Sequence, residues 1–475
     1  MTAALAIILF TVLASTAVGV LAGRRQPLDM ENWTLGGRRF GVLLMWLLMA
    51  GEVYTTFTFL GASGWAYTRG APVFYIPIYG TLAYVLGFFI LPRLWRIGKS
   101  RNLHTQPDFF ASVYGSRALG IAVALIGIAS ILPYLQLQLK GLGLIVEVAS
   151  GGAVSSSAAI AGAFVLTCVF VFTSGLRGTA GGSVIKDVLM IAAVGIVGSG
   201  VPLKYFGGFG ALFRALAARH PGHLVFPGAT ADMNALWVMS TVIVTGAGFY
   251  MWPHMVGSAF SAKSEKVLRR NAIIMPFYQL FIFLVFMVGF TALLVVPGLK
   301  NGDLAFLTLV QKTYPAWFLG FVGAAGAVTA MVPASVLVLF ASTLLAKNVY
   351  QAVFRPAADE RSVMRLSRAL VIVIMAVALV FALVFPSALV NLLLIGYDGV
   401  SQFFPGMILG LFWKRVRAEG ILTGLAAGIA VAAGLVFTGH DPLAGLNAGF
   451  IALAVNSAIA VGISLALGKK PVRSL

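Results

Sequence analysis

The sequence is poor in charged residues, above all in acidic ones, and in cysteine. Only 10% of its 475 residues are charged, 60% are hydrophobic, and the mean hydropathy is +0.97. Since about 25% of the residues in a soluble domain are charged, this scarcity excludes a soluble enzyme, a disordered chain and a nucleic-acid-binding domain. The one cysteine, Cys168, lies in an apolar run. It excludes an intrachain disulfide and indicates no thiol chemistry.

Long apolar runs are what the sequence has in abundance. A run of about 20 apolar residues can cross a bilayer, and 13 such runs follow one another along the chain. They cover residues 2–22, 40–69, 72–92, 117–147, 157–175, 184–203, 233–257, 273–297, 317–347, 366–384, 387–413, 420–438 and 446–468. We expect an all-α polytopic membrane protein with 13 transmembrane helices. The first run is followed, not preceded, by the basic pair Arg24 and Arg25, so we expect a retained helix and not a signal peptide.

The basic residues are distributed unequally between alternate loops. With the N-terminus outside, the cytoplasmic loops and helix ends hold 25 of the 33 Lys and Arg residues, and the outer loops hold six. Such an excess is typical of cytoplasmic loops. We therefore expect a multi-pass protein of the cytoplasmic membrane with its C-terminus in the cytoplasm. The net charge of +19 then reflects topology in the lipid bilayer, and no nucleic-acid or protein partner is indicated.

Sequence motifs of enzymes are absent. The chain has no P-loop, no HExxH, no CxxC, and five scattered histidines that form no metal-ligand pattern. Its longest loops, 93–116 and 204–232, are too short for a catalytic domain. We expect no enzyme activity, no cofactor and no ATP-driven transport.

Ionisable residues inside the apolar runs are costly in a membrane, so they usually face a cavity or a partner. They are Glu52, Lys140, Glu147, Lys186, Asp187 and Asp398. Glu147 lies near the end of its run, where a local pair would satisfy it. Lys186 and Asp187 begin a run, so a pair facing cytoplasmic water is equally possible. Glu52 and Asp398 lie deeper and are the better functional candidates.

Three segments combine polar residues with helix-breaking ones. Residues 49–58 gather glycine and hydroxyls around Glu52, which predicts an interrupted helix of the kind that lines transporter sites. Packing of small residues between helices is the alternative. In 134–140, Gln136 and Lys140 share a helical face and Gln138 points elsewhere. Residues 396–406 bring glycine, proline and Asp398 together.

At these segments the chain resembles the sodium:solute symporter family from about residue 1 to 435. The resemblance lies in five motifs that occur in the family's order and spacing. They are Phe59-Leu60-Gly61-Ala62-Ser63-Gly64, Lys186-Asp187 in place of the family's Thr-Asp, Trp252-Pro253-His254, Asn348-Val349-Tyr350, and Phe403-Phe404-Pro405 through Trp413-Lys414.

The resemblance implies a LeuT-like core of two inverted five-helix repeats, here residues 40–203 and 233–413. Residues 1–39 would add one helix and a basic loop, 204–232 an extracellular loop, and 414–475 two further helices with a short basic tail. The implied function is secondary active symport of a small organic solute. Residues 51–56 and 396–399 look most like the branch that transports short monocarboxylates such as acetate, propionate, pyruvate or lactate.

In this reading the substrate would be a small carboxylate held by polar residues from three helices. The candidates are Glu52, Tyr54, Thr55, Thr56, Gln136, Lys140 and Asp398. Lys140 would supply a cation for the carboxylate, while Tyr54, Thr55, Thr56 and Gln136 would supply hydrogen bonds.

The family's sodium site is where the sequence departs from the pattern. Alignment through Asn348-Val349-Tyr350 puts the backbone ligands at Gly51, Tyr54 and Thr329, and the two hydroxyl ligands at Val332 and Pro333. Neither of these last two has a side-chain oxygen. Pro333 has no N–H and would leave the carbonyl of Thr329 without its helical partner, so that this carbonyl could still face a cation. The site would nevertheless lose two hydroxyl ligands and gain only one carbonyl. We therefore expect a degenerate sodium site and predict no bound metal.

Lys186 lies on the helix that passes close to this sodium site in related folds, next to Asp187. Its ammonium could replace the ion and exchange a proton. We therefore expect a monocarboxylate symporter that uses H⁺ rather than Na⁺, with Glu52, Lys186 and Asp398 as candidate proton carriers. The alternatives are a sodium-coupled symporter of proline, pantothenate or a sugar, and, in another class, a channel or a transport-like sensor.

Overall fold

The computed structural model describes residues 3–23, 29–385 and 387–468, and in these ranges every regular element is a helix. The first half of the chain contains α1 (Ala3–Gly23), α2 (Met30–Leu35), η1 (Gly36–Arg38), α3 (Val42–Val53), η2 (Phe57–Gly61), α4 (Ala62–Thr68), η3 (Ala71–Phe74), α5 (Tyr75–Ser100), α6 (Gln106–Tyr114), α7 (Arg117–Ala149), α8 (Ser156–Phe206), α9 (Phe209–Arg219) and η4 (Pro221–Leu224).

The second half contains α10 (Ala235–Gly248), η5 (Phe249–Met251), α11 (Pro253–Phe260), α12 (Glu265–Gln279), α13 (Phe281–Val295), η6 (Gly302–Leu304), α14 (Ala305–Thr313), α15 (Ala316–Thr343), η7 (Leu344–Gln351), α16 (Glu360–Val384), α17 (Leu389–Val400), η8 (Ser401–Phe403), α18 (Phe404–Phe412), α19 (Ala418–Phe437) and α20 (Ala448–Ala466).

The predicted all-α membrane architecture is confirmed, but the predicted number of spans is not. Among the described residues, ten helices are long and apolar enough to cross a membrane, or up to 12 if each of two bent pairs counts as one span. The run predicted at 157–175 corresponds to a shorter apolar helix, Ser156–Phe172, which a kink at Gly175 separates from the rest of α8. The count of 13 stays a prediction.

Two of the spans are broken near their middle. Val42–Val53 and Phe57–Thr68 meet at 53°, and Ala235–Met251 and Pro253–Phe260 meet at 47°. Glycine and hydroxyl residues predicted the first break. The second break, at Trp252, was not predicted, although Pro253 marks it because proline favours the first turn of a new helix. The two breaks lie one in each of the predicted repeats.

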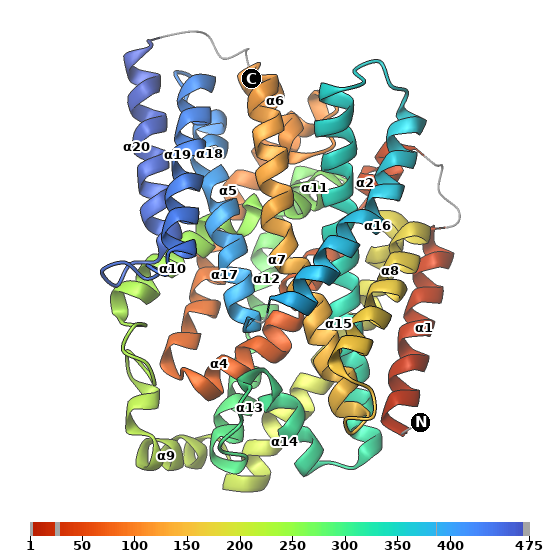
Figure 1. Ribbon diagram of the computed structural model, residues 1–475, viewed down its shortest axis with the longest axis vertical. Helices are drawn as coiled ribbons and strands as arrows, with labels where there is room; N and C mark the ends of the chain where they lie inside the picture. Colours follow the sequence, from red (N-terminus) through yellow and green to blue (C-terminus); the bar gives the residue numbers. More distant parts are fainter. Residues whose placement is uncertain (1–2, 24–28, 386, 469–475) are drawn as a thin grey trace.

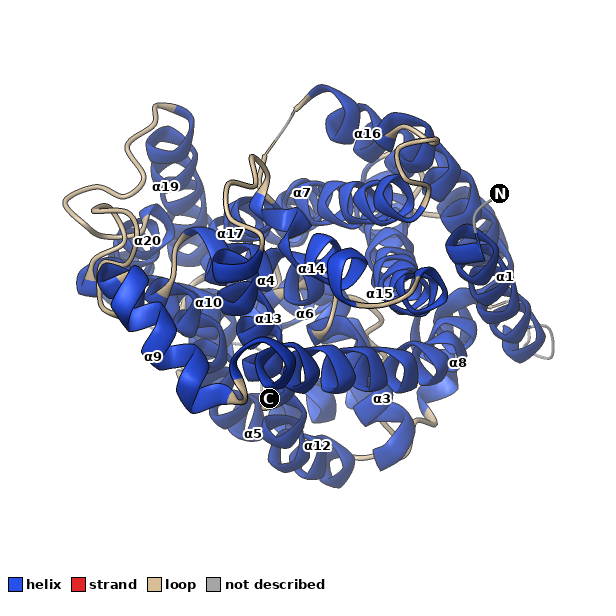
Figure 2. Cartoon of the chain, turned by 90° about the horizontal axis from the view of Figure 1, so that it is seen from below, coloured by secondary structure: helices blue, strands red, loops and turns tan. Residues whose placement is uncertain are grey.

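Helix α15 forms the centre of the bundle and packs against α1, α7 and α8. Its small residues allow this close packing: a Cβ on Gly320 would come within 2.7 Å of the backbone of Ala4. In both views α1 lies at one edge of the bundle and α19 and α20 at the opposite edge (Figure 1, Figure 2). Helix α1 begins at the lower end of Figure 1 and α20 finishes at the upper end, the arrangement that the predicted odd number of crossings would give.

The short helix α6 is hydrogen-bonded to η7, the π-helix that continues the central helix α15. Asp108 of α6 accepts hydrogen bonds from the side chains of Lys347 and Asn348 in η7, and Thr105 donates to Asn348 Oδ1 at 2.9 Å. Thr105 and Asp108 also form the capping box of α6. We call these four residues with His104 the α6–η7 latch.

Candidate functional site

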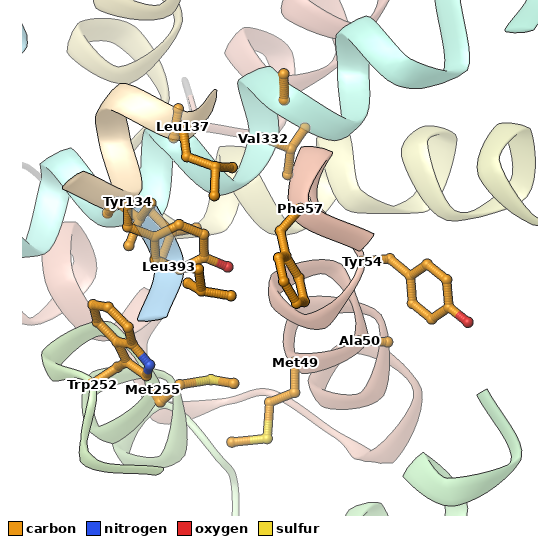
Figure 3. Close-up of a cluster of buried hydrophobic side chains, with 14 of the residues drawn as sticks. Met49, Ala50, Tyr54, Phe57, Tyr134, Leu137, Trp252, Met255, Val332 and Leu393 are labelled. Atoms are coloured by element: carbon orange, nitrogen blue, oxygen red, sulfur yellow. The ribbon is translucent and has the colours of Figure 1, made fainter. Parts of the chain in front are cut away.

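The first element of the candidate site is the broken segment between α3 and η2. Helix α3 ends at Val53, Tyr54 adopts an extended conformation (φ −89°, ψ 98°), and the chain resumes as a π-helix at Phe57. Figure 3 shows the Tyr54 and Phe57 side chains pointing to different sides of this segment. A break inside an apolar bundle exposes backbone carbonyls that need partners. The predicted interrupted helix is confirmed.

Lys186 of α8 supplies the partner for two of these carbonyls. Its ammonium donates to the carbonyl oxygens of Gly51 at 2.9 Å and Tyr54 at 3.2 Å, and it pairs with Asp187 Oδ1 at 2.8 Å. An ammonium has three N–H donors, so all three are used. The side chain is fully buried, which rules out a helix-end lysine facing water.

Asp187 connects the ammonium to a third helix. Its Oδ1 also accepts the hydroxyl of Tyr278 in α12 at 2.8 Å, and Tyr54 donates its hydroxyl to the carbonyl of Tyr278 at 3.1 Å. The other oxygen, Oδ2, is buried and has no hydrogen-bond partner in the described part of the chain. One buried charge pair thus bridges α3, α8 and α12.

A sodium ion does not fit the residues present here. Gly51 and Tyr54, which the resemblance aligned with sodium ligands, already accept from Lys186. Val332 of α15 packs against α8 at Gly182, which is four residues, or about one helical turn, before Lys186. Its Cγ2 is 3.4 Å from the position that a Cβ on Gly182 would take. It brings methyl groups where a hydroxyl would be needed. Pro333 and Thr329 are buried in α15, and within the described residues neither forms a hydrogen bond with the Lys186 ammonium.

Glu52 belongs to a second buried polar group, which faces α11. Ser258 donates to Glu52 Oε1 at 2.8 Å, and Nε2 of His254 lies 3.6 Å from Oε2. Neither partner was predicted from the sequence. Their signal was the proline-marked start of α11, because His254 and Ser258 are four residues apart on that helix and share one face. The Glu52 carbonyl also accepts the Tyr134 hydroxyl at 3.2 Å.

Gln138 of α7, and not Gln136, reaches the broken segment. Its Oε1 accepts from the hydroxyl and the backbone N–H of Thr56. Because the N–H can only donate, the amide is oriented with Nε2 turned away from Thr56. Nε2 is buried and has no partner among the described residues. The site therefore contains a free amide donor, which suits a ligand that accepts hydrogen bonds.

The remaining predicted residues lie elsewhere. Gln136 donates to the carbonyls of Phe381 and Phe385 at 3.1 and 2.7 Å, and Lys140 donates to the carbonyl of Ser387 at 2.7 Å. Both therefore face the end of α16 and the segment that follows it. Asp398 lies against α20, where a Cβ on Gly449 would come within 2.3 Å of its Oδ1. The substrate roles proposed for these three residues stay predictions.

Aromatic rings form an apolar wall beside the break. Tyr134 packs on Trp252 with ring centroids 5.1 Å apart, Trp252 on Tyr397 at 5.4 Å, and Tyr397 on Tyr79 at 5.8 Å. Figure 3 shows Tyr134, Trp252 and Leu393 opposite Phe57 and Met49. In the described chain no group of three or more His, Cys, Asp or Glu could hold a metal ion. The site thus combines an apolar wall with few polar groups, as small-molecule sites do.

Comparison with known sequences gives consistent matches over nearly the whole chain. The profile of the sodium:solute symporter family matches residues 33–428. The uncharacterized symporter YhjB of Bacillus subtilis is 43% identical over 98% of this chain and 97% of its own length. A monocarboxylate transport permease protein of Rhizobium johnstonii is 29% identical over 99% of this chain and 98% of its own.

A solved structure of similar fold is that of a Na⁺-coupled sialic acid symporter. It superimposes with a TM-score of 0.81 at 16% identity, over 100% of this chain and 99% of that one. At this identity the likeness shows the fold alone, which is the LeuT-like fold that the resemblance implied.

Proposed function

The chain belongs to the sodium:solute symporter family, and from that premise we propose that it is a symporter of short monocarboxylates driven by protons and not by sodium. Membership of the family and the shared fold support the function of a symporter. The substrate and the coupling ion are our own inferences, and each inference rests on a separate observation.

The coupling proposal rests on one observation, the three acceptors around the Lys186 ammonium. Gly51 O, Tyr54 O and Asp187 Oδ1 use its three N–H donors. Loss of one proton would leave only two donors and would leave the Asp187 charge uncompensated in the bundle. The protonation state of Lys186 would therefore change how firmly the broken segment of α3 is held against α8. Such a change can link proton release to movement of that segment.

A second proton position is available nearby. Glu52 Oε2 lies 3.6 Å from His254 Nε2, while Ser258 occupies Oε1. Both groups can bind a proton, and neither has another charged partner within salt-bridge distance in the described chain. In this proposal Glu52 and Lys186, on the two sides of the α3 break, are the proton-binding groups.

The substrate proposal rests on the polarity of the site. The free Nε2 of Gln138 would donate to a carboxylate, while the wall of Tyr134, Trp252 and Tyr397 would contact a short acyl group. The relative named as a monocarboxylate transport permease protein supports this class of substrate. The polar groups described at the break are too few for a sugar, whose many hydroxyls would each need a partner.

Uptake of labelled acetate and pyruvate into proteoliposomes tests the proposal. An inward proton gradient and an inward sodium gradient would be imposed separately, each with an ionophore control. We expect accumulation with the proton gradient and no response to sodium. Sodium-driven accumulation would contradict the coupling proposal, and no uptake of either acid under any gradient would contradict the substrate proposal.

A further inference from the structure

A polar cavity lies away from the α3 break. Its volume is about 560 Å³, and it is lined by α4, α7, the segment leading into η6, and the residues just before α17. The residues that define its chemistry are Trp65, Arg69, Lys140, Lys300, Asp303 and Ser387. Gly64 of its wall follows Thr56 by eight residues, so the cavity is on the order of 10 Å along the helix from the break.

The cavity has an excess of positive charge. Arg69, Lys140 and Lys300 line it together with one carboxylate, Asp303. Asp303 Oδ2 accepts the backbone N–H of Leu389 at 3.1 Å, and burial raises the pKa of this carboxyl group. Arg69 and Lys300 belong to none of the ion pairs of the described residues. In the described chain, therefore, no carboxylate lies within salt-bridge distance of Arg69 or Lys300.

The position of these cations is unusual for this chain. Only six of the 33 Lys and Arg residues lie in the loops that the basic-residue count predicts to be outside, and two of those six, Arg69 and Lys300, meet Lys140 at one cavity. The Lys140 ammonium donates one hydrogen bond to the carbonyl of Ser387 at 2.7 Å, which leaves two N–H donors for a ligand.

We propose that this cavity is an antechamber that attracts small carboxylate anions before they reach the broken segment of α3. This inference rests on the proposed substrate class and adds a second site to it. A cavity of about 560 Å³ has room for a short carboxylate together with several waters. The cations would therefore act through their field and raise the local concentration of anions, without a close-fitting contact.

The double variant Arg69→Gln/Lys300→Gln tests the antechamber. Arg214→Gln/Arg219→Gln is the matched control, because it removes two exposed charges of α9, another element predicted to be outside, without touching the cavity. At low ionic strength we expect the KM for acetate uptake to rise about 3- to 10-fold in the first variant only, with an unchanged maximal rate. The difference should shrink at about 200 mM salt, where the field is screened. Equal KM shifts in both variants, or none in either, would overturn the proposal.

A binding measurement separates this proposal from the transport function. Saturation-transfer NMR of acetate with the purified wild-type protein reports weak binding without any transport. Binding that Arg69→Gln/Lys300→Gln reduces and Arg214→Gln/Arg219→Gln preserves supports the antechamber, even if wild-type uptake fails. Binding that is equal in all three proteins, or absent from the wild type, overturns it. A failure of wild-type uptake on its own contradicts only the proposed function.

Discussion

In the proposed mechanism, the buried Lys186 replaces the chemistry of a bound ion. A cation bound to carbonyls of a broken helix needs oxygen ligands, and a buried ammonium satisfies the same carbonyls without leaving the protein. Its charge is balanced by the adjacent Asp187. We propose proton coupling here because an ammonium group stays attached to the protein and can still release and rebind a proton.

The first prediction concerns this pair. Lys186→Met alone would leave the Asp187 charge buried and unpaired, at a cost of about 3–5 kcal/mol, so both residues should be changed together. We expect Lys186→Met/Asp187→Asn to fold, to catalyse exchange of labelled for unlabelled acid, and to lose accumulation driven by a proton gradient. Both activities are measured in the same proteoliposomes.

A variant at a distant charge pair provides the control for this experiment. Arg417→Met/Glu419→Gln removes an ion pair of 3.2 Å at the start of α19 and should keep both activities. Proton-driven accumulation that survives Lys186→Met/Asp187→Asn would contradict the role of Lys186.

The second prediction separates two glutamines that are two residues apart. Gln136 donates to two carbonyls at the end of α16, whereas Gln138 Nε2 is free beside Thr56. Gln136→Leu should lower the free energy of unfolding by about 1–3 kcal/mol, the loss of two hydrogen bonds, with little change in KM. Gln138→Leu also removes two hydrogen bonds, those from Thr56, so it should lower the free energy of unfolding by a similar amount; unlike Gln136→Leu, it should also raise the KM for acetate about 10-fold or more. Thermal unfolding and uptake kinetics of both variants test this pair, and the opposite pattern would assign the substrate to Gln136.

At the scale of elements, the broken helices and the α6–η7 latch differ in their structural roles. The breaks at Tyr54 and Trp252 each supply backbone and side-chain groups at the centre of the bundle. The α6–η7 latch holds a short helix to the end of α15 through Asp108. Burial alone would raise the pKa of Asp108, but the Lys347 ammonium and the hydrogen bonds to this carboxylate outweigh burial and hold the pKa at about 2.

The third prediction is a pH dependence of the latch. Burial, with help from Lys347, lowers the pKa of His104 from 6.5 to about 4. Between these values the unfolded chain binds a proton and the folded latch does not, so stability falls as the pH falls from 6.5 to 4. Asp108, with an ordinary pKa of 3.8 and a pKa of about 2 in the folded chain, adds a slope of the same sign mainly below about pH 4.5. We expect a loss on the order of 2 kcal/mol between about pH 7 and pH 4.5, measured by thermal unfolding. In the variant His104→Gln the loss of stability over this pH range should be smaller by about this amount, and an unchanged slope would assign it to another group.

At the scale of the whole molecule, the unequal distribution of basic residues predicts the orientation. The fourth prediction uses Cys168, the only cysteine, which Cys168→Ser removes. In that background, Ala218→Cys in the last turn of α9 and Ala357→Cys before α16 place single exposed thiols in segments predicted to lie on opposite sides. A membrane-impermeant maleimide should label residue 218 in intact cells and residue 357 only after permeabilisation. The reverse labelling would place the N-terminus in the cytoplasm.

The sequence alone determined the class of the protein and most of its helices. Apolar runs predicted the spans of α5, α7, α15 and α16 to within a few residues at most ends, because burial in lipid depends on the length and composition of one continuous segment. The same local information predicted the break near Glu52 and drew attention to Lys186.

Only the tertiary structure decided which polar groups meet. Gln136 and Gln138 have the same chemistry, and the rotation of α7 in the bundle directs one to α16 and the other to Thr56. The contact of Lys186 with Gly51 joins residues 135 positions apart in the chain. Such contacts depend on how separate helices pack against one another, and periodicity within one helix does not report that packing. The partners of Glu52, which lie on α11, could not be predicted from the sequence for the same reason.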